Sequence, residues 1–139
     1  MNSKIERNIE KTFELLENSH SPYSNFRVAS SVITKENHFY GGVNIENISY
    51  GLTMCAERCA IYNAITNGID IKEIDYIIIV TNCTDKLFPC GACLQVLSEF
   101  LNKNTKIIIS SYDKKNRKKN RNEFLFKELL PNVFHINKE

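Results

Sequence analysis

The sequence predicts a three-layer α/β domain, in which a five-stranded mixed sheet carries helices on both faces. Apolar runs rich in β-branched residues alternate with segments of helical periodicity, and between residues 39 and 110 the order is strand, helix, strand, helix, strand. Such an order is typical of a sheet whose parallel strands are joined by right-handed helical crossovers. The chain has 139 residues, of which 42% are hydrophobic, so we expect one domain over residues 1–139.

The first part of the chain predicts a helix followed by a strand pair. Apolar residues recur every three or four positions between residues 4 and 18, as they do in an amphipathic helix. They are Ile5, Ile9, Phe13 and Leu16. A strand is expected over residues 26–34, and the polar turn at residues 35–37 predicts a hairpin with a second strand over residues 38–45.

A second helix is expected over residues 54–67. The apolar residues that we expect to face the core are Ala60, Ile61, Ala64 and Ile65. Gly68 stands where a left-handed C-terminal cap commonly ends a helix. Cys55 and Glu57 would then both lie in the first turn of this helix.

The second half of the chain predicts the remaining strands. Residues 74–81 form a nearly unbroken β-branched run, which is typical of a strand covered on both faces, and residues 106–110 repeat this pattern. Between them, residues 91–101 read as a helix. A fifth strand near residues 124–126 and a short turn at residues 128–130 would complete the domain.

Composition and charge restrict the class of protein. No apolar run reaches the roughly 18 residues that suggest a membrane span, and the N-terminus lacks a signal-peptide pattern, so we expect a soluble cytoplasmic protein with no membrane partner. Six basic residues crowd into eight positions without an acid: Lys114, Lys115, Arg117, Lys118, Lys119 and Arg121. We interpret this basic cluster as a solvated turn between strands and not as a nucleic-acid footprint, because asparagines interleave with it and no aromatic residue does. Five cysteines, an odd number, favour metal ligands or buried thiols over a disulfide framework.

Three cysteines and one glutamate form the motif that bears most on function. Cys55 lies two positions before Glu57, and 35 residues after Cys55 the run Pro89-Cys90-Gly91-Ala92-Cys93 supplies two more thiols. Structural zinc sites close all four positions with protein ligands, whereas catalytic sites keep one position for water or substrate. Three thiols beside a carboxylate therefore predict an open metal site. Both thiol groups are expected at helix N-termini, whose partial positive charge favours the thiolate.

Zinc is the expected ion, because thiolate-rich tetrahedral sites select it, and iron is the less favoured alternative. At the open position zinc would lower the pKa of water from about 16 towards roughly 7 and so supply hydroxide at neutral pH. Glu57 could take the water's proton and return it to a ring nitrogen and then to a leaving amine, as hydrolytic deamination requires. Arg58 could donate hydrogen bonds to ligand sulfurs, although an exposed helix arginine would occupy the same position in sequence.

The chain resembles the zinc-dependent cytidine deaminases of the small homotetrameric type, within the cytidine and deoxycytidylate deaminase superfamily, whose ligand set and glutamate are already described. The matching segments are Cys55-Ala56-Glu57-Arg58 and residues 89–96, 21–26, 44–47, 50–52 and 128–131. Together they span about residues 20–134. The resemblance implies a cytidine deaminase-like fold, one Zn²⁺ per chain on Cys55, Cys90 and Cys93, and a homotetramer. It also implies hydrolysis of cytidine and deoxycytidine to uridine and deoxyuridine with release of ammonia, in pyrimidine salvage.

The resemblance assigns roles to individual residues. Glu57 would be the proton shuttle, and the substrate-binding residues would be Phe26, Asn44, Glu46 and Ala56. Asn44 and Glu46 would hold the ribose hydroxyls, since an amide and a carboxylate suit a pair of groups that both donate and accept. Phe26 would stack near the pyrimidine, and the Ala56 amide would contact the base carbonyl. Each residue alone also suits an ordinary core or strand-end position, so the assignment depends on their joint spacing from Cys55.

The resemblance also suggests two subunit-contact residues, and the chain departs from the family pattern at several positions. Tyr50 and Phe134 resemble residues at subunit contacts, where neighbouring chains complete the active site. The chain departs from the family pattern at Ser30, Ser31, Leu94 and Cys59. Cys59 lies four residues after Cys55 on the same helix face, deeper along the axis, and we expect it to face the core. Cys83, outside both motifs, is expected to be a buried or half-buried thiol.

Three alternatives compete with a nucleoside deaminase. Cys59 could join the three ligands in a closed, structural four-thiolate site, but the nucleoside-holding segments would then be unexplained. A polynucleotide base could be the substrate, with the basic cluster on the backbone, but Glu46 would repel a nearby phosphate. An aminonucleoside deaminase of the blasticidin type shares the zinc motif, but Asn44 with Glu46 favours ribose. We therefore predict a small-molecule nucleoside substrate and no nucleic-acid partner.

Overall fold

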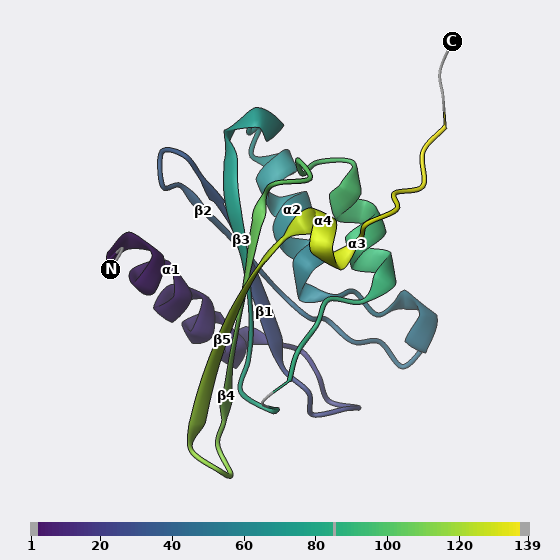
Figure 1. Ribbon diagram of the computed structural model, residues 1–139. Coiled ribbons are helices and arrows are strands. Elements are labelled where there is room, and N and C mark those ends of the chain that lie inside the picture. The colour runs from purple at the N-terminus through teal and green to yellow at the C-terminus, as the bar shows by residue number, and fades with distance from the viewer. Residues whose placement is uncertain (1–2, 85, 137–139) are drawn as a thin grey trace.

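The computed structural model describes residues 3–84 and 86–136, whose strands form one five-stranded sheet in the order β2-β1-β3-β4-β5. The strands are β1 (Val28–Thr34), β2 (Phe39–Val43), β3 (Ile74–Thr81), β4 (Lys106–Asp113) and β5 (Lys118–Leu125). The α-helices are α1 (Ser3–Glu14), α2 (Ala56–Thr66), α3 (Gly91–Ser98) and α4 (Phe126–Leu129), and the 3₁₀ turns are η1 (Leu15–Asn18), η2 (Tyr50–Leu52) and η3 (Ile71–Glu73). Helix α1 covers one face of the sheet, and α2, α3 and α4 lie on the other (Figure 1). The predicted three-layer mixed architecture is confirmed.

The strand directions place the two cysteine motifs at one end of the sheet. Strand β1 pairs antiparallel with both β2 and β3, β3 pairs parallel with β4, and β4 pairs antiparallel with β5. Helix α3 provides the crossover between the parallel strands, so its N-terminus follows the carboxyl end of β3. Loops at the carboxyl ends of parallel strands commonly carry ligand sites.

The core consists of two apolar layers, one on each face of the sheet. The residues of β3 and β4 that face α2 and α3 are Ile77, Ile79, Ile107 and Ile109. The alternate residues Ile78, Val80 and Ile108 face α1, where they pack with Ile9 and Leu16. This alternation explains why both strands read as nearly unbroken β-branched runs: most of their residues are buried on one face or the other.

Several element ends differ from the sequence prediction. The first helix turns into η1 after Glu14, α3 ends at Ser98 and β4 continues to Asp113. Gly68 has a φ of +79°, which confirms the left-handed cap after α2. Ile65, which we expected in the core, is exposed, because it lies at the edge of the buried stripe of α2.

The fifth strand is the main correction to the predicted elements. It begins at Lys118 and not near residue 124, so half of the basic cluster lies on a strand and only residues 114–117 form the turn. Phe126, expected in the strand, starts α4 instead. The side chains of β5 are mostly solvated, which removes the apolar alternation that usually marks a strand. Arg121 pairs with Glu6 and Glu123, so this part of the cluster is neutralised within the chain.

Candidate metal and substrate site

The first thiol lies at the N-terminus of α2, which packs closely on β2. Cys55 is the N-cap residue in an extended conformation and therefore precedes the first turn in which we expected it. At Gly42 of β2, an added Cβ would lie 2.3 Å from the Ala60 nitrogen and 2.8 Å from the Ala56 oxygen. The strand and helix backbones thus touch at a position that only glycine permits. This contact fixes the start of α2 relative to the sheet.

The other two thiols come from the N-terminus of α3. Cys90 is its N-cap residue, and its Sγ accepts a hydrogen bond from the Cys93 backbone N–H at 3.4 Å. Cys93 is fully buried, whereas Cys90 is exposed. One helix end therefore presents one thiol from inside the fold and one from its surface.

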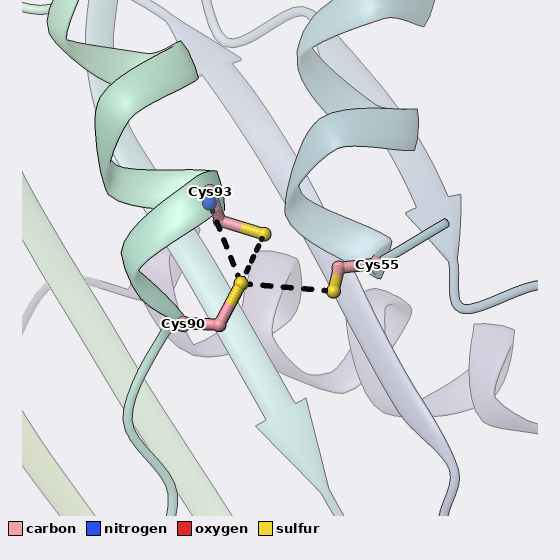
Figure 2. Close-up of side chains that lie close together, drawn as sticks. All are labelled: Cys55, Cys90 and Cys93. Atoms are coloured by element: carbon pink, nitrogen blue, oxygen red, sulfur yellow. Dashed lines mark hydrogen bonds between the residues drawn. The ribbon is translucent and has the colours of Figure 1, made fainter. Parts of the chain in front are cut away.

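The three thiols converge between the two helix ends (Figure 2). Their Sγ atoms lie within 4.8 Å of one another, with 3.9 Å between Cys55 and Cys90 and 3.4 Å between Cys90 and Cys93. Tetrahedral zinc with Zn–S bonds of about 2.3 Å holds its sulfurs roughly 3.8 Å apart. The donor set and its spacing therefore fit zinc. Cys59, which is half-buried, is not part of this cluster, so the geometry does not support a closed four-thiolate site.

The surroundings of the thiol cluster favour negative charge on the sulfur of Cys55. Arg58 donates a hydrogen bond from Nη2 to Cys55 Sγ at 3.3 Å, and its Nε is buried with no partner among the described residues. Hydrogen bonds from Cys93, Arg58 and Cys90 hold the pKa of Cys55 well below its usual value. The same interaction with Cys55, together with burial, raises the pKa of Cys93. Arg58 lies against the sulfurs as predicted, and its own pKa is raised by its hydrogen bond to Cys55.

Glu57 lies beside the cluster in a desolvated position. Its side chain is only 5% exposed, although it belongs to the first turn of a helix whose N-terminus attracts anions. Burial raises the pKa of its carboxyl group, and the nearby Cys55 raises it further. A carboxyl group whose pKa is moved towards neutrality is well suited to accept and return a proton.

A cavity of about 360 Å³ opens next to Cys55, Glu57 and Cys90. This volume lies within the roughly 300–1,000 Å³ of small-molecule sites. All the residues that we expected to contact substrate line it, namely Phe26, Asn44, Glu46 and Ala56. The structure thus brings the predicted substrate residues and the predicted proton shuttle to one cavity, which we call the nucleoside cavity.

Several residues that line the nucleoside cavity were missed by the sequence reasoning, among them two apolar residues before α3. Leu87 and Phe88 line the nucleoside cavity from the segment that leads into α3, and Phe88 is 62% exposed. The sequence did hold one clue to their role, since residues that directly precede a metal ligand such as Cys90 must lie near the site. The clue is weak, because apolar side chains such as these are more often part of the hydrophobic core.

Asn44 is held in place by hydrogen bonds within the fold. Its Oδ1 accepts from the Val28 N–H at 3.0 Å and from the Ser19 hydroxyl, and its Nδ2 donates to the Phe26 carbonyl at 2.7 Å. An amide nitrogen carries two hydrogens, so one donor remains for a ligand. Asn44 can therefore offer a donor at a fixed position.

Glu46 is likewise tied to the segment that precedes β1. Its carboxylate accepts hydrogen bonds from the Tyr23 N–H at 3.0 Å, the Ser24 N–H at 3.1 Å and the Ser24 hydroxyl at 2.5 Å. The Ser24 hydroxyl is the main reason why the pKa of Glu46 lies below its usual value. A carboxylate has about four lone-pair sites, so a preoriented acceptor remains available.

The remaining predicted residues lie outside the nucleoside cavity. Tyr50 is 74% exposed and Phe134 is 69% exposed, so their assignment to subunit contacts stays a prediction. Cys83 is exposed and not buried or half-buried as we expected, because it follows the end of β3 at the surface. Among the described residues, no helix is long and apolar enough to cross a bilayer.

Comparisons with known proteins agree with this site. Residues 2–111 match the family model described as "Cytidine and deoxycytidylate deaminase zinc-binding region". A cytidine deaminase from Mycoplasma genitalium is 36% identical over 135 residues, which cover 96% of this chain and 98% of that protein. A cytidine deaminase from Halalkalibacterium halodurans is 35% identical over 126 residues, covering 91% and 90%. The crystal structure of a cytidine deaminase from Burkholderia pseudomallei superposes with a TM-score of 0.85 at 30% identity, covering 96% of this chain and 100% of that one.

Proposed function

The chain belongs to the cytidine and deoxycytidylate deaminase family of zinc-dependent hydrolases, and from this premise we propose that it hydrolyses cytidine and deoxycytidine to uridine and deoxyuridine. Ammonia is the second product. One observation carries the proposal: a single cavity is lined by two zinc-binding thiols, a buried carboxyl group and four residues suited to hold a nucleoside. We place the reaction in pyrimidine salvage in the cytoplasm.

The thiol cluster and its surroundings would hold the zinc ion. Cys55, Cys90 and Cys93 supply three ligands, and Arg58 with the two helix N-termini offsets the negative charge of the thiolates. When bound, zinc supplies Lewis acidity, which lowers the pKa of a water molecule in contact with it.

Glu57 transfers the protons of the reaction. Its side chain lines the nucleoside cavity, in which the nucleophilic water and the base would lie. It takes one proton from the water and gives it to the ring nitrogen. It then takes the second proton from the hydroxyl group now on the base and gives it to the amine, which leaves as ammonia when the C–N bond breaks and the carbonyl forms. The raised pKa of its carboxyl group suits both halves of this cycle.

The opposite wall of the nucleoside cavity orients the substrate. The free N–H of Asn44 and the carboxylate of Glu46 receive the ribose hydroxyls, while Phe26 offers an apolar face to the pyrimidine. Since Asn44 and Glu46 are already held by the fold, little ordering is needed when the ribose binds. The Ala56 N–H at the start of α2 binds the base carbonyl.

The decisive experiment compares substrates on the zinc-loaded chain. We expect ammonia release and loss of cytidine absorbance with cytidine and deoxycytidine, and no turnover of a cytosine-containing oligonucleotide. Zinc content measured in the same preparation should be one ion per chain. Activity on the oligonucleotide alone would replace the nucleoside with a polynucleotide substrate, and a zinc-loaded chain inert on all three would overturn the proposal.

We further propose a homotetramer, in which exposed apolar residues lie at subunit contacts. Tyr50 and Phe134 are among the exposed large hydrophobic residues, together with Leu52 and Ile48. Such side chains are stabilised when an interface covers them. Sedimentation analysis should give the mass of four chains, and Phe134→Ser should shift it towards smaller species; a monomer at working concentration would contradict this assembly.

A further inference from the structure

A second cavity, of about 590 Å³, is lined by the segment of residues 19–25, which also contributes to the nucleoside cavity. Its lining includes His20, Arg27 and Lys114, and none of the described residues that line it is acidic. We call it the basic cavity, and we propose that it is a binding site for a phosphate-bearing anion. Nothing in the deamination reaction uses these three side chains.

The basic cavity is built from three separate parts of the chain. The segment before β1 supplies His20 and Arg27, the residues after β3 supply Asn82 and Cys83, and the turn between β4 and β5 supplies Lys114. Residues that are far apart in sequence are therefore folded around one concave surface.

Arg27 is held so that its guanidinium group has a defined position. Its backbone N–H donates to Cys83 Sγ at 3.5 Å, and its carbonyl accepts from the Thr81 hydroxyl at 2.7 Å. Its Nη1 donates to the Leu16 carbonyl at 3.3 Å. A guanidinium has five N–H donors, so this anchored side chain keeps others for a ligand, and its planar fork matches the oxygens of a phosphate.

The remaining lining groups suit an anion with several acceptor oxygens. Lys114 adds a second permanent positive charge, and His20 adds a ring N–H donor. Ser19, Ser21 and Asn25 add further polar groups. Asp113, the acid next to Lys114, does not line the basic cavity, and its carboxylate accepts hydrogen bonds within the turn from Lys115 and Asn116.

The contrast with the nucleoside cavity indicates where a phosphate group would go. Two carboxyl groups, Glu46 and Glu57, line the nucleoside cavity, and a carboxylate repels a phosphate. Glu46 attracts His20 electrostatically across the segment of residues 19–25, but it accepts its hydrogen bonds from Tyr23 and Ser24. Among the described lining residues, acids occur only in the nucleoside cavity, so a phosphate suits the basic cavity better.

The test is a calorimetric titration of the full zinc-loaded chain with inorganic phosphate, at constant ionic strength maintained with sodium chloride. We expect saturable binding of one phosphate per chain. Arg27→Gln should weaken the affinity by about tenfold, as expected for the loss of a charge-assisted hydrogen bond, and Lys114→Gln should weaken it similarly. Arg27→Lys, which keeps the charge, should retain measurable binding if Arg27→Gln fails to fold.

Lys115→Gln is the matched control, because Lys115 lies in the same turn and does not line the basic cavity. It should leave the affinity for phosphate unchanged. Equal losses in Lys114→Gln and Lys115→Gln would show diffuse attraction by the turn, and no saturation above the chloride background would show no site; either result overturns the proposal. A second titration with adenosine 5′-monophosphate, against adenosine, distinguishes a nucleotide phosphate from the free ion. Binding is read without turnover, so the outcome is independent of the proposed deaminase activity.

Discussion

The two helix N-termini that form the metal site differ in what they carry and in how they are held. The end of α2 supplies a single thiol, but also Glu57 and Arg58, and it is pressed against β2 at Gly42. The end of α3 supplies two thiols, one buried and one exposed, and follows the irregular segment after β3. The groups to which we assign proton transfer and charge balance thus lie on the helix end that is fixed by backbone contact, where small displacements of a catalytic group cost the most activity.

The largest effect should come from the α3 end, through loss of the metal. Cys90→Ser and Cys93→Ser each remove a ligand. Mutating a residue that only hydrogen-bonds to a metal ligand already weakens metal affinity by about 10–100-fold, so we expect more than a 100-fold loss of zinc affinity in both variants. Metal analysis after dialysis against a weak chelator measures this. Cys83→Ser, outside the cluster, should keep one zinc per chain; full zinc content in either ligand variant would remove that residue from the site.

The metal-free forms of the same variants sharpen the contrast between the buried and the exposed thiol. Cys93→Ser places a hydroxyl group in a fully buried position, so the free energy of unfolding should fall by about 1–3 kcal/mol in excess chelator. Cys90→Ser should match the metal-free parent. Urea denaturation gives both values, and equal stability of the two variants would contradict the difference in burial.

At the α2 end, Glu57→Gln should reduce kcat by about 10²–10⁴-fold while zinc stays bound, because the amide cannot relay protons. Steady-state kinetics on cytidine together with metal analysis measures both quantities. Glu99→Gln, at the C-terminal end of α3, is a charge-matched control and should retain full activity. Turnover by Glu57→Gln within a few fold of the parent would rule out this residue as the shuttle.

Gly42→Ala tests the backbone contact that holds α2. The added methyl group would meet Ala60 and Ala56 backbone atoms, so we expect a loss of about 1–3 kcal/mol in unfolding free energy and a lower kcat with zinc retained. Gly51→Ala is the matched control, because an added Cβ there meets no atom within 4 Å. If the two substitutions gave the same stability and activity, the close approach of β2 would not position the site.

The smallest effect is expected for Cys59→Ser. This thiol lies on α2 but outside the thiol cluster, so zinc content and activity should be unchanged, and stability should change by less than about 1 kcal/mol. Metal analysis measures the zinc content, and urea denaturation measures the free energy of unfolding. Loss of zinc would show that the site is closed by a fourth thiolate and would remove the basis for an open catalytic position.

Sequence reasoning succeeded where one physical pattern dominates. The β-branched runs gave β3 with its observed bounds, and the position of Gly68 gave the end of α2, because burial on both faces and a left-handed cap each leave a clear sequence signal. The clustering of Cys55, Cys90 and Cys93 followed from their expected places at two helix starts.

It failed where tertiary context decides. Strand β5 has solvated side chains, so its identity comes from backbone pairing with β4, which no periodicity reveals. Phe88 contributes to the cavity because the segment before Cys90 crosses its mouth, and Cys83 is exposed because β3 ends just before it. The hydrogen bonds that anchor Asn44 and Glu46 also depend on residues some 20 positions away.

Strand β5 has a consequence for how copies of this chain can associate. It is an edge strand of the sheet, and it carries the charged residues Lys118, Lys119, Arg121 and Glu123. Charged side chains along a terminal strand discourage another chain from adding to the sheet. Growth of the sheet into fibrils from this edge is therefore disfavoured, which leaves the exposed apolar residues Ile48, Tyr50 and Leu52 to the subunit contacts that we propose.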